Sequence, residues 1–214
     1  MAAAGDLRVS ITGSGGHGSM PWLSKDPVSV LVEVMSSLQT MITKRFNAFD
    51  PIILNIGWIR AGDTATTNVI PETASFGATV RTFSKEHSEK LQEYTNQLVH
   101  GIAESYGLTA TVEFGRATKV LMNDESAIKQ VEKVTEDLFG KGRYINLPTP
   151  IAGGEDFASI LEEIPGAFVF MGACPADVDP KTAATNHSNK AVFDDQVLAG
   201  GAALLAALAL EASR

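Results

Sequence analysis

Residues 7–13 read LRVSITG, with apolar side chains at every second position: Leu7, Val9 and Ile11. This period of two predicts a β-strand with one buried and one exposed face. A helix is predicted after it, because Asp26 can accept hydrogen bonds from a first helical turn and Pro27 suits its first position. The apolar stripe of that helix is Leu31, Val34, Leu38 and Met41.

Two more strands are predicted at residues 52–59 (IILNIGWI) and 73–83 (TASFGATVRTF). The polar connection between them contains Gly62 and Pro71, which oppose regular structure, and it is long for a hairpin. Ser84 can cap a second helix that ends at Gly107. Its predicted apolar stripe is Leu91, Tyr94, Leu98, Ile102 and Tyr106, and the strand LTATVEF follows at residues 108–114.

The predicted order is therefore βαββαβ, the arrangement of ferredoxin-like domains, in which two helices cover one face of a four-stranded antiparallel sheet. We assign this domain to residues 5–116. An open sheet leaves an edge strand with unpaired amides and carbonyls, which a second copy of the chain can satisfy. The sequence thus predicts a dimer formed through the sheet edge.

Residues 117–214 form the second predicted domain, with α/β layers that hold too few strands for a normal covered sheet. A helix is predicted at residues 124–139 and a buried strand at residues 167–173 (AFVFMGA). The last helix, beginning near Asp194, is apolar nearly all round, which suits burial on several sides. The fold class is α/β, with an α+β first domain.

Composition limits the possible partners. The 214 residues carry a formal net charge of −8, which disfavours nucleic acid, since phosphate contacts need a basic surface. One cysteine rules out an internal disulfide framework and fits a reducing compartment. The first residues do not read as a signal peptide, and the apolar C-terminal stretch is too short to predict a membrane span. A cytoplasmic protein is the default expectation.

His17 is the first candidate site residue, because it lies in the glycine-rich segment TGSGGHGSMPWLSKD at residues 12–26. Glycines let the backbone approach a ligand and leave the imidazole free to donate a hydrogen bond to a developing negative charge. A glycine-rich turn that merely contains a histidine is equally compatible with this pattern. The histidines at positions 87 and 100 are predicted to be solvated residues of the second helix.

His187 lies in the polar stretch ATNHSNKAVFDD, where an imidazole could reach a metal, although a zinc site needs about three protein ligands. Glu155 and Asp156 of GGEDF stand at a predicted helix start, where acidic residues are favoured by the helix dipole alone. The preceding Gly153 and Gly154 could offer backbone amides to a bound carbonyl or carboxylate.

Asn68 lies in the long connection between strands, and Arg81 lies near the end of a strand. The planar guanidinium of arginine matches a carboxylate in two parallel hydrogen bonds, but a lone strand arginine is more often solvated.

In this order, the motifs resemble the dinuclear metallo-hydrolases that include aminoacylases, hippurate hydrolases, auxin-conjugate amidohydrolases and bacterial glutamate carboxypeptidases. The matching stretches are GGHGSMP with DPV, TNVIPETASFGATVRTF, GGEDFA, PGAFVFMG and NHSNKAVFDD. In that family the βαββαβ unit is a lid that also forms the dimer and is inserted into a larger α/β catalytic domain.

The resemblance implies a role for each candidate. His187 resembles a ligand of one of two metal ions, zinc or manganese. His17 resembles the lid histidine that stabilises the oxyanion in the active site of the partner subunit. Asn68 and Arg81 resemble contacts to the substrate's oxyanion or carboxylate, and Gly153 and Gly154 resemble backbone contacts to substrate. The implied reaction is hydrolysis of an N-acyl amino acid or a similar small amide.

The remaining metal ligands and the general base precede the lid in this family, so we expect the chain to be the C-terminal part of such an enzyme. Alone it is expected to be inactive, to bind no metal tightly and to need the N-terminal catalytic half. The alternative is a non-catalytic dimeric module that binds a small acidic ligand or a protein partner. A third hypothesis is an independent metal site formed by His187 with Glu155 or Asp156, for which the number of ligands is small.

Overall fold

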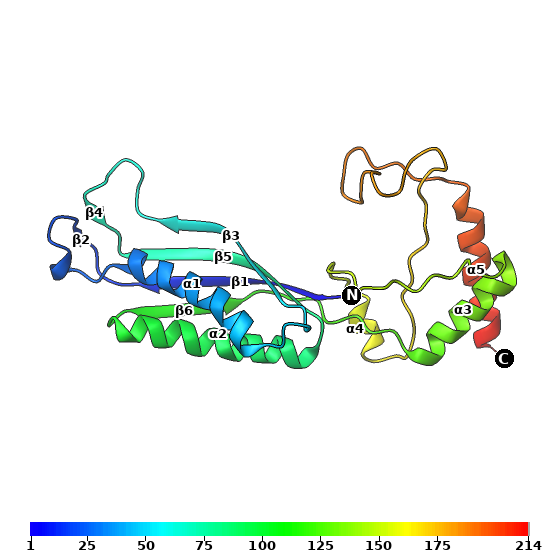
Figure 1. Ribbon diagram of the computed structural model, residues 1–214, viewed down its shortest axis with the longest axis horizontal. Coiled ribbons are helices and arrows are strands. Elements are labelled where there is room, and N and C mark those ends of the chain that lie inside the picture. Colours follow the sequence, from blue (N-terminus) through cyan, green and yellow to red (C-terminus); the bar gives the residue numbers. More distant parts are fainter. Residues whose placement is uncertain (214) are drawn as a thin grey trace. The chain divides into compact units, whose positions relative to one another are not determined.

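The computed structural model describes residues 1–213, shown in Figure 1. The chain divides into two compact units. The first contains Met1–Leu121 together with Thr149–Ile160, and the second contains Met122–Pro148 and the segment from Leu161 onward.

The first unit is built on a four-stranded antiparallel sheet in the order β3-β5-β1-β6. The strands are β1 (Ala3–Thr12), β3 (Ile53–Ala61), β5 (Thr73–Thr82) and β6 (Thr109–Phe114). With helices after β1 and β5, the main elements follow the predicted βαββαβ order. The alternation that predicted β1 is also confirmed, because Leu7, Val9 and Ile11 are buried.

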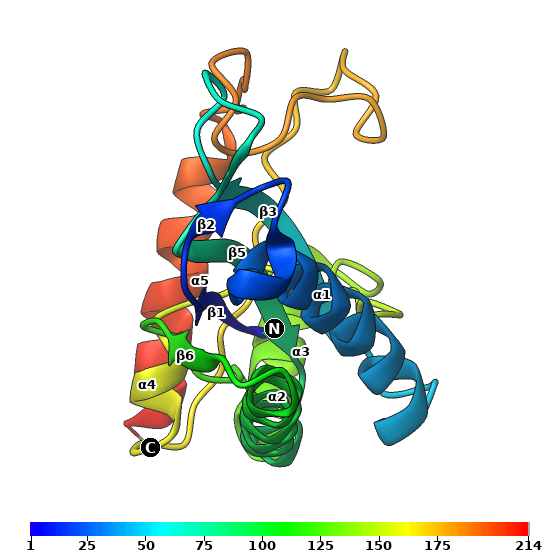
Figure 2. The ribbon, with the colours of Figure 1, turned by 90° about the vertical axis from the view of Figure 1, so that its left-hand side faces the viewer.

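Two helices, α1 (Pro27–Arg45) and α2 (Lys85–Ser105), cover one face of this sheet, as Figure 2 shows. The carboxylate of Asp26 accepts hydrogen bonds from the amides of Val28 and Ser29 at the start of α1. The Ser84 hydroxyl accepts one from the His87 amide at the start of α2. Both caps are those that the sequence predicts, because these side chains satisfy amides that a helix leaves free.

The core lies between the helices and the sheet, and it corrects the predicted stripe of α2. The buried residues of that helix are Leu91, Thr95, Val99 and Ala103. The predicted Tyr94, Leu98 and Ile102 are only partly buried at its edge. Tyr106 is 53% exposed, and its hydroxyl donates to the Glu33 carboxylate at 2.6 Å, which raises the pKa of Tyr106. The buried residues thus pack toward the sheet, while Tyr94 and Leu98 lie on the side toward α1.

Thr95 provides a test of this packing, because its hydroxyl is fully buried and has no hydrogen-bond partner within residues 1–213. An unpaired buried hydroxyl costs about 1–3 kcal/mol. We therefore expect Thr95→Val, which keeps the shape, to increase the free energy of unfolding by about 1 kcal/mol in urea denaturation. Thr82→Val is the matched control: Thr82 is buried and hydrogen-bonded to the Ser88 hydroxyl, so its replacement should lower stability. Equal losses in both variants would show that the Thr95 hydroxyl has a partner.

The edges of the sheet differ in chemistry. Strand β3 exposes Ile53, Trp58 and Ile59 at 40%, 47% and 57% of their surface. A register irregularity between Ile56 and Trp58 distorts its pairing with β5. The exposed side chains of the opposite edge strand, β6, are instead the polar Thr109, Thr111 and Glu113. The apolar edge is therefore β3.

The second unit contains α3 (Glu125–Phe139) and α5 (Val197–Ala212), which pack together and are joined by an ion pair of 2.9 Å between Lys133 and Glu211. The predicted strand at residues 167–173 is wrong for this structure, in which these residues form no regular element. No strand of the described chain lies beside them to pair with their backbone. The predicted burial of the last helix is also wrong here, since no residue of α5 is buried.

Within residues 1–213, no helix is long and apolar enough to cross a membrane.

Candidate functional site

His17 and Asn68 are brought together by a small antiparallel ribbon at one end of the first unit. The ribbon consists of β2 (Gly16–His17) and β4 (Val69–Ile70), with His17 opposite Val69. The Gly18 amide donates to the Asn68 carbonyl at 2.8 Å. Both candidate side chains are exposed. The ribbon therefore brings the backbones of two segments that are far apart in the sequence close together.

Glycine at position 18 favours this close approach. A Cβ there would lie 3.3 Å from the carbonyl carbon and oxygen of Asn68, tighter than ordinary side-chain contacts. The glycines around His17 thus serve to bring two backbones together, as well as to leave the imidazole open.

The tautomer of His17 follows from its neighbour. The backbone amide of Ser19 donates to Nδ1 of His17 at 3.2 Å, and the Ser19 hydroxyl lies 2.8 Å from the same nitrogen. Because an amide can only donate, Nδ1 is the unprotonated nitrogen and Nε2 carries the proton of the neutral ring. The Nε2–H group is therefore available to an oxyanion. Ser19 is not among the residues predicted from the sequence, although its position two residues after His17 permits this contact.

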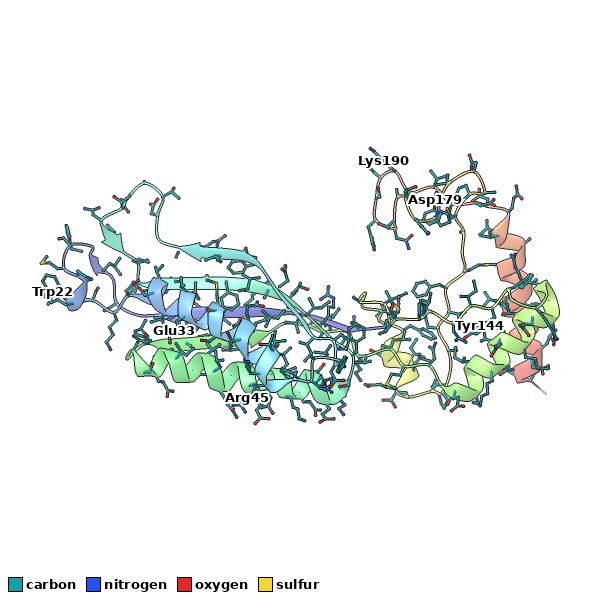
Figure 3. The ribbon with its side chains drawn as sticks, in the orientation of Figure 1. Trp22, Glu33, Arg45, Tyr144, Asp179 and Lys190 are labelled. Atoms are coloured by element: carbon teal, nitrogen blue, oxygen red, sulfur yellow. The ribbon has the colours of Figure 1, made fainter. Side chains whose placement is uncertain are left out.

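The ribbon ends in an ordered apolar turn. A short 3₁₀ helix, η1 (Pro21–Leu23), is held by hydrogen bonds from the Leu23 amide to Met20 and from the Ser24 amide to Pro21. Trp22 and Leu23 are nevertheless 75% and 73% exposed. Figure 3 shows Trp22 projecting from this end of the unit.

Arg81 lies at the other end of the sheet, on β5, where it faces Ala4 of β1 and Ile53 of β3. Its Nη1 donates to the Thr79 hydroxyl at 2.6 Å and to the Val80 carbonyl at 2.8 Å. The eight residue-to-residue steps from Thr73 to Arg81 span about 27 Å of extended strand. Since His17 and Asn68 lie beyond the Thr73 end, Arg81 does not share a site with them in one copy of the chain (Figure 1).

Gly153 and Gly154 lie beside the beginning of β1. The Ala2 amide donates to the Ile151 carbonyl at 3.0 Å, so this segment flanks the strand. A Cβ on Gly154 would lie 2.5 Å from the Ala4 Cβ and 2.6 Å from the Thr118 hydroxyl. Close packing is therefore a sufficient reason for glycine at position 154.

This contact predicts different results for the two glycines. Gly154→Ala should lower the free energy of unfolding by about 1–3 kcal/mol, because overpacking displaces Thr118, whose hydroxyl accepts from the Ala4 amide. Gly153→Ala should change stability by less than about 0.5 kcal/mol, since its Cβ would meet only ordinary contacts. Urea denaturation of both variants measures the difference, and similar values would contradict the packing role of Gly154.

His187 lies in an exposed loop with a positive φ of 71°, the one such value for a non-glycine residue within residues 1–213. Histidine tolerates this region better than most residues, and such positions gather at functional sites. Among residues 1–213, no three His, Cys, Asp or Glu side chains gather to hold a metal ion. The hypothesis of an independent site of His187 with Glu155 or Asp156 stays a prediction, because His187 belongs to the second unit and the two carboxylates belong to the first.

Glu155 and His87 have structural roles. The Glu155 carboxylate accepts from the Phe157 amide at 3.3 Å, just before the short helix α4 (Ala158–Leu161). His87, predicted to be solvated, instead lies 3.5 Å from the Asp50 carboxylate and packs edge-on against Phe46. This contact was not foreseen because Asp50 lies in the loop after α1, whereas His87 lies in the first turn of α2.

This chain is similar in sequence to known protein families and to individual hydrolases. Residues 3–107 match a family described as the peptidase dimerisation domain of the M20 peptidases. The chain is 34% identical over 172 residues to an N-acetyl-L-cysteine deacetylase of Bacillus subtilis, covering 80% of this chain and 40% of that protein. It is 26% identical to a hippurate hydrolase of Campylobacter jejuni, covering 99% of this chain and 53% of that protein.

Solved structures agree with this comparison. A dinuclear metal-binding peptidase of the M20 family from Bacillus subtilis superimposes with a TM-score of 0.76 at 25% identity, covering 99% of this chain and 50% of that chain. This chain thus spans about half the length of the curated relatives that it matches. Residues 3–107 therefore match the dimerisation domain of the M20 peptidases, and the whole chain is similar to proteins of that family over about half of their length.

Proposed function

We propose that this chain supplies the dimerisation domain and part of the catalytic domain of a metal-dependent hydrolase that cleaves the amide bond of N-acyl amino acids or similar small amides. In this proposal residues 5–116 are the lid, residues 117–214 belong to the catalytic domain, and the chain alone does not turn over substrate. The names of the relatives, a deacetylase of N-acetyl-L-cysteine and a hydrolase of hippurate, support this substrate class.

The position of His17 in the ribbon carries the proposal. Amide hydrolysis places negative charge on the former carbonyl oxygen, and donors already aimed at that position stabilise the transition state. The Ser19 contacts keep the Nε2–H of His17 free to donate. We propose the side-chain amide of Asn68, which immediately precedes β4, as a second donor. The two groups thus form part of an oxyanion site in this proposal.

The position of Arg81 supports a site built from two copies. Its guanidinium is the proposed partner of the substrate's carboxylate, but about 27 Å of strand separate it from the His17 ribbon. A small amide cannot reach both ends in one copy. We therefore propose a homodimer in which Arg81 of one copy and the ribbon of the other serve the same substrate.

The β3 edge is the surface proposed for dimerisation, because it exposes Ile53, Trp58 and Ile59 beside unpaired backbone groups. Exposed apolar edge strands promote pairing with another chain. Pairing through the opposite edge strand, β6, would bury polar side chains and would not bury this apolar surface.

The metal requirement is a further part of the proposal. The solved relative is described as dinuclear. We propose two divalent ions, zinc or manganese, with His187 as one ligand. The other metal ligands would come from a segment that corresponds to the half of the relatives that this chain does not match. When bound, such ions polarise a carbonyl. Gly153 and Gly154 are proposed as backbone contacts to substrate. A reducing compartment such as the cytoplasm fits the single cysteine.

A domain exchange tests the function. Residues 3–107 would replace the corresponding domain of the Bacillus subtilis N-acetyl-L-cysteine deacetylase, and hydrolysis of N-acetyl-L-cysteine would be measured with zinc and with manganese. We expect activity to be retained in the folded, dimeric chimera. A dimeric chimera that binds but does not hydrolyse this amide would favour the alternative, a non-catalytic binding module.

A further inference from the structure

A groove of about 490 Å³ lies between α1 and α2, on the side of the first unit formed by the helices. It is lined by residues spaced three and four apart along each helix, from Ser37 to Arg45 on α1 and from Tyr94 to Leu98 on α2. This spacing places them on the facing sides of the two helices. The volume falls within the range of small-molecule sites.

The groove combines an apolar floor with cationic groups at one end. Met41, Leu98 and the ring of Tyr94 supply the apolar surface. Lys44 and Arg45 stand in the last turn of α1. Cations in the last turn of a helix offset the helix dipole, which is sufficient to explain the charge of Lys44 and Arg45. It does not explain the apolar groove beside them.

The two cations differ in how they are held. The Arg45 guanidinium lies over the Tyr94 ring, 5.0 Å from its centre, so a cation–π contact fixes it at the groove. Lys44 is exposed and has no ion-pair or hydrogen-bond partner within residues 1–213. The amide of Gln97, which also lines the groove, donates to the Glu93 carboxylate at 3.0 Å. One positioned cation and one unpaired cation therefore adjoin the apolar floor, in a chain with a net charge of −8.

We propose that this groove binds a small amphiphilic monocarboxylate, with its carboxylate between Lys44 and Arg45 and its apolar chain along Met41 and Leu98. Charge-assisted hydrogen bonds from the two cations fix the carboxylate, and burial of the chain adds a hydrophobic contribution. From Lys44 to Ser37 the helix rises about 10 Å, which gives room for a short acyl chain. The site is separate from His17, Asn68 and Arg81, and it does not depend on the proposed function.

Octanoate and the neutral octanamide are the probes, titrated into the purified chain by calorimetry. We expect octanoate to bind about tenfold more tightly than octanamide, and Lys44→Gln and Arg45→Gln each to weaken octanoate about tenfold. Lys90→Gln is the matched control, because Lys90 is paired with Glu86 on α2 and does not line the groove. It should leave octanoate affinity unchanged. Thermal unfolding monitored by circular dichroism checks that every variant is folded.

Three results would overturn the proposal: no octanoate binding, equal binding of octanoate and octanamide, or octanoate binding that Lys44→Gln and Arg45→Gln leave intact. Leu98→Ala should weaken both probes, since it removes part of the floor without changing charge. If Leu98→Ala weakens neither probe, the apolar chain does not occupy the groove. These binding results do not test amide hydrolysis, which the domain exchange measures separately.

Discussion

His17→Ala in the domain-exchange chimera is expected to lower kcat for N-acetyl-L-cysteine by about 10²–10³-fold. The loss of one preorganised donor to an oxyanion typically costs this much, about 2.7–4 kcal/mol of transition-state stabilisation. KM should change little, because the interaction develops mainly in the transition state. Steady-state kinetics at saturating metal provide the measurement.

Two controls separate catalysis from folding. His100→Ala changes a histidine on α2, outside the ribbon, and should leave kcat unchanged. Ser19→Ala removes one of the two contacts to Nδ1 while the backbone amide remains, so we expect a smaller loss of kcat. Full activity in the folded His17→Ala chimera would contradict the oxyanion role.

Gly13→Ala is expected to cause the largest loss of stability, about 3 kcal/mol in urea denaturation. A Cβ at Gly13 would overlap the backbone carbonyl oxygen of Lys25 and would lie 3.0 Å from Leu108 Cδ2. That carbonyl accepts from the Ser14 amide at 3.0 Å, so it cannot move without breaking the base of the His17 ribbon.

Gly101→Ala is the matched control for this prediction. Gly101 is an exposed residue inside α2, and a Cβ there would meet no atom within 4 Å. Alanine should therefore stabilise the protein by about 0.5–1 kcal/mol, because glycine is a poor helix former. If both substitutions change stability equally, the steric explanation for Gly13 is wrong.

The first domain could be predicted because its signals are local. The alternation of Leu7, Val9 and Ile11 and the caps Asp26 and Ser84 depend only on neighbours in the chain, and the structure contains the elements that they predict. The stripe of α2 was less well predicted. Which of Leu91, Tyr94 and Thr95 faces the sheet depends on how closely the helix approaches it.

The second unit shows the limit of sequence patterns. The run at residues 167–173 has the composition of a buried strand, but a strand needs a neighbour for its backbone hydrogen bonds. Helix α5 likewise has an apolar sequence, yet none of its residues is buried within residues 1–213. The composition of a segment indicates which secondary structure it can form and whether it can be buried. Contacts with other segments decide whether it does either.

By itself, the sequence determined the βαββαβ order, the helix ends and the candidates His17, Asn68 and Arg81, because periodicity, capping and residue chemistry are properties of short segments. Only the tertiary structure decided which candidates share a site. Strand pairing places His17 opposite Val69, so that the backbone of Asn68 lies beside that of Gly18, while the length of β5 keeps Arg81 about 27 Å away. Spatial proximity depends on strand register and length, which no single segment encodes.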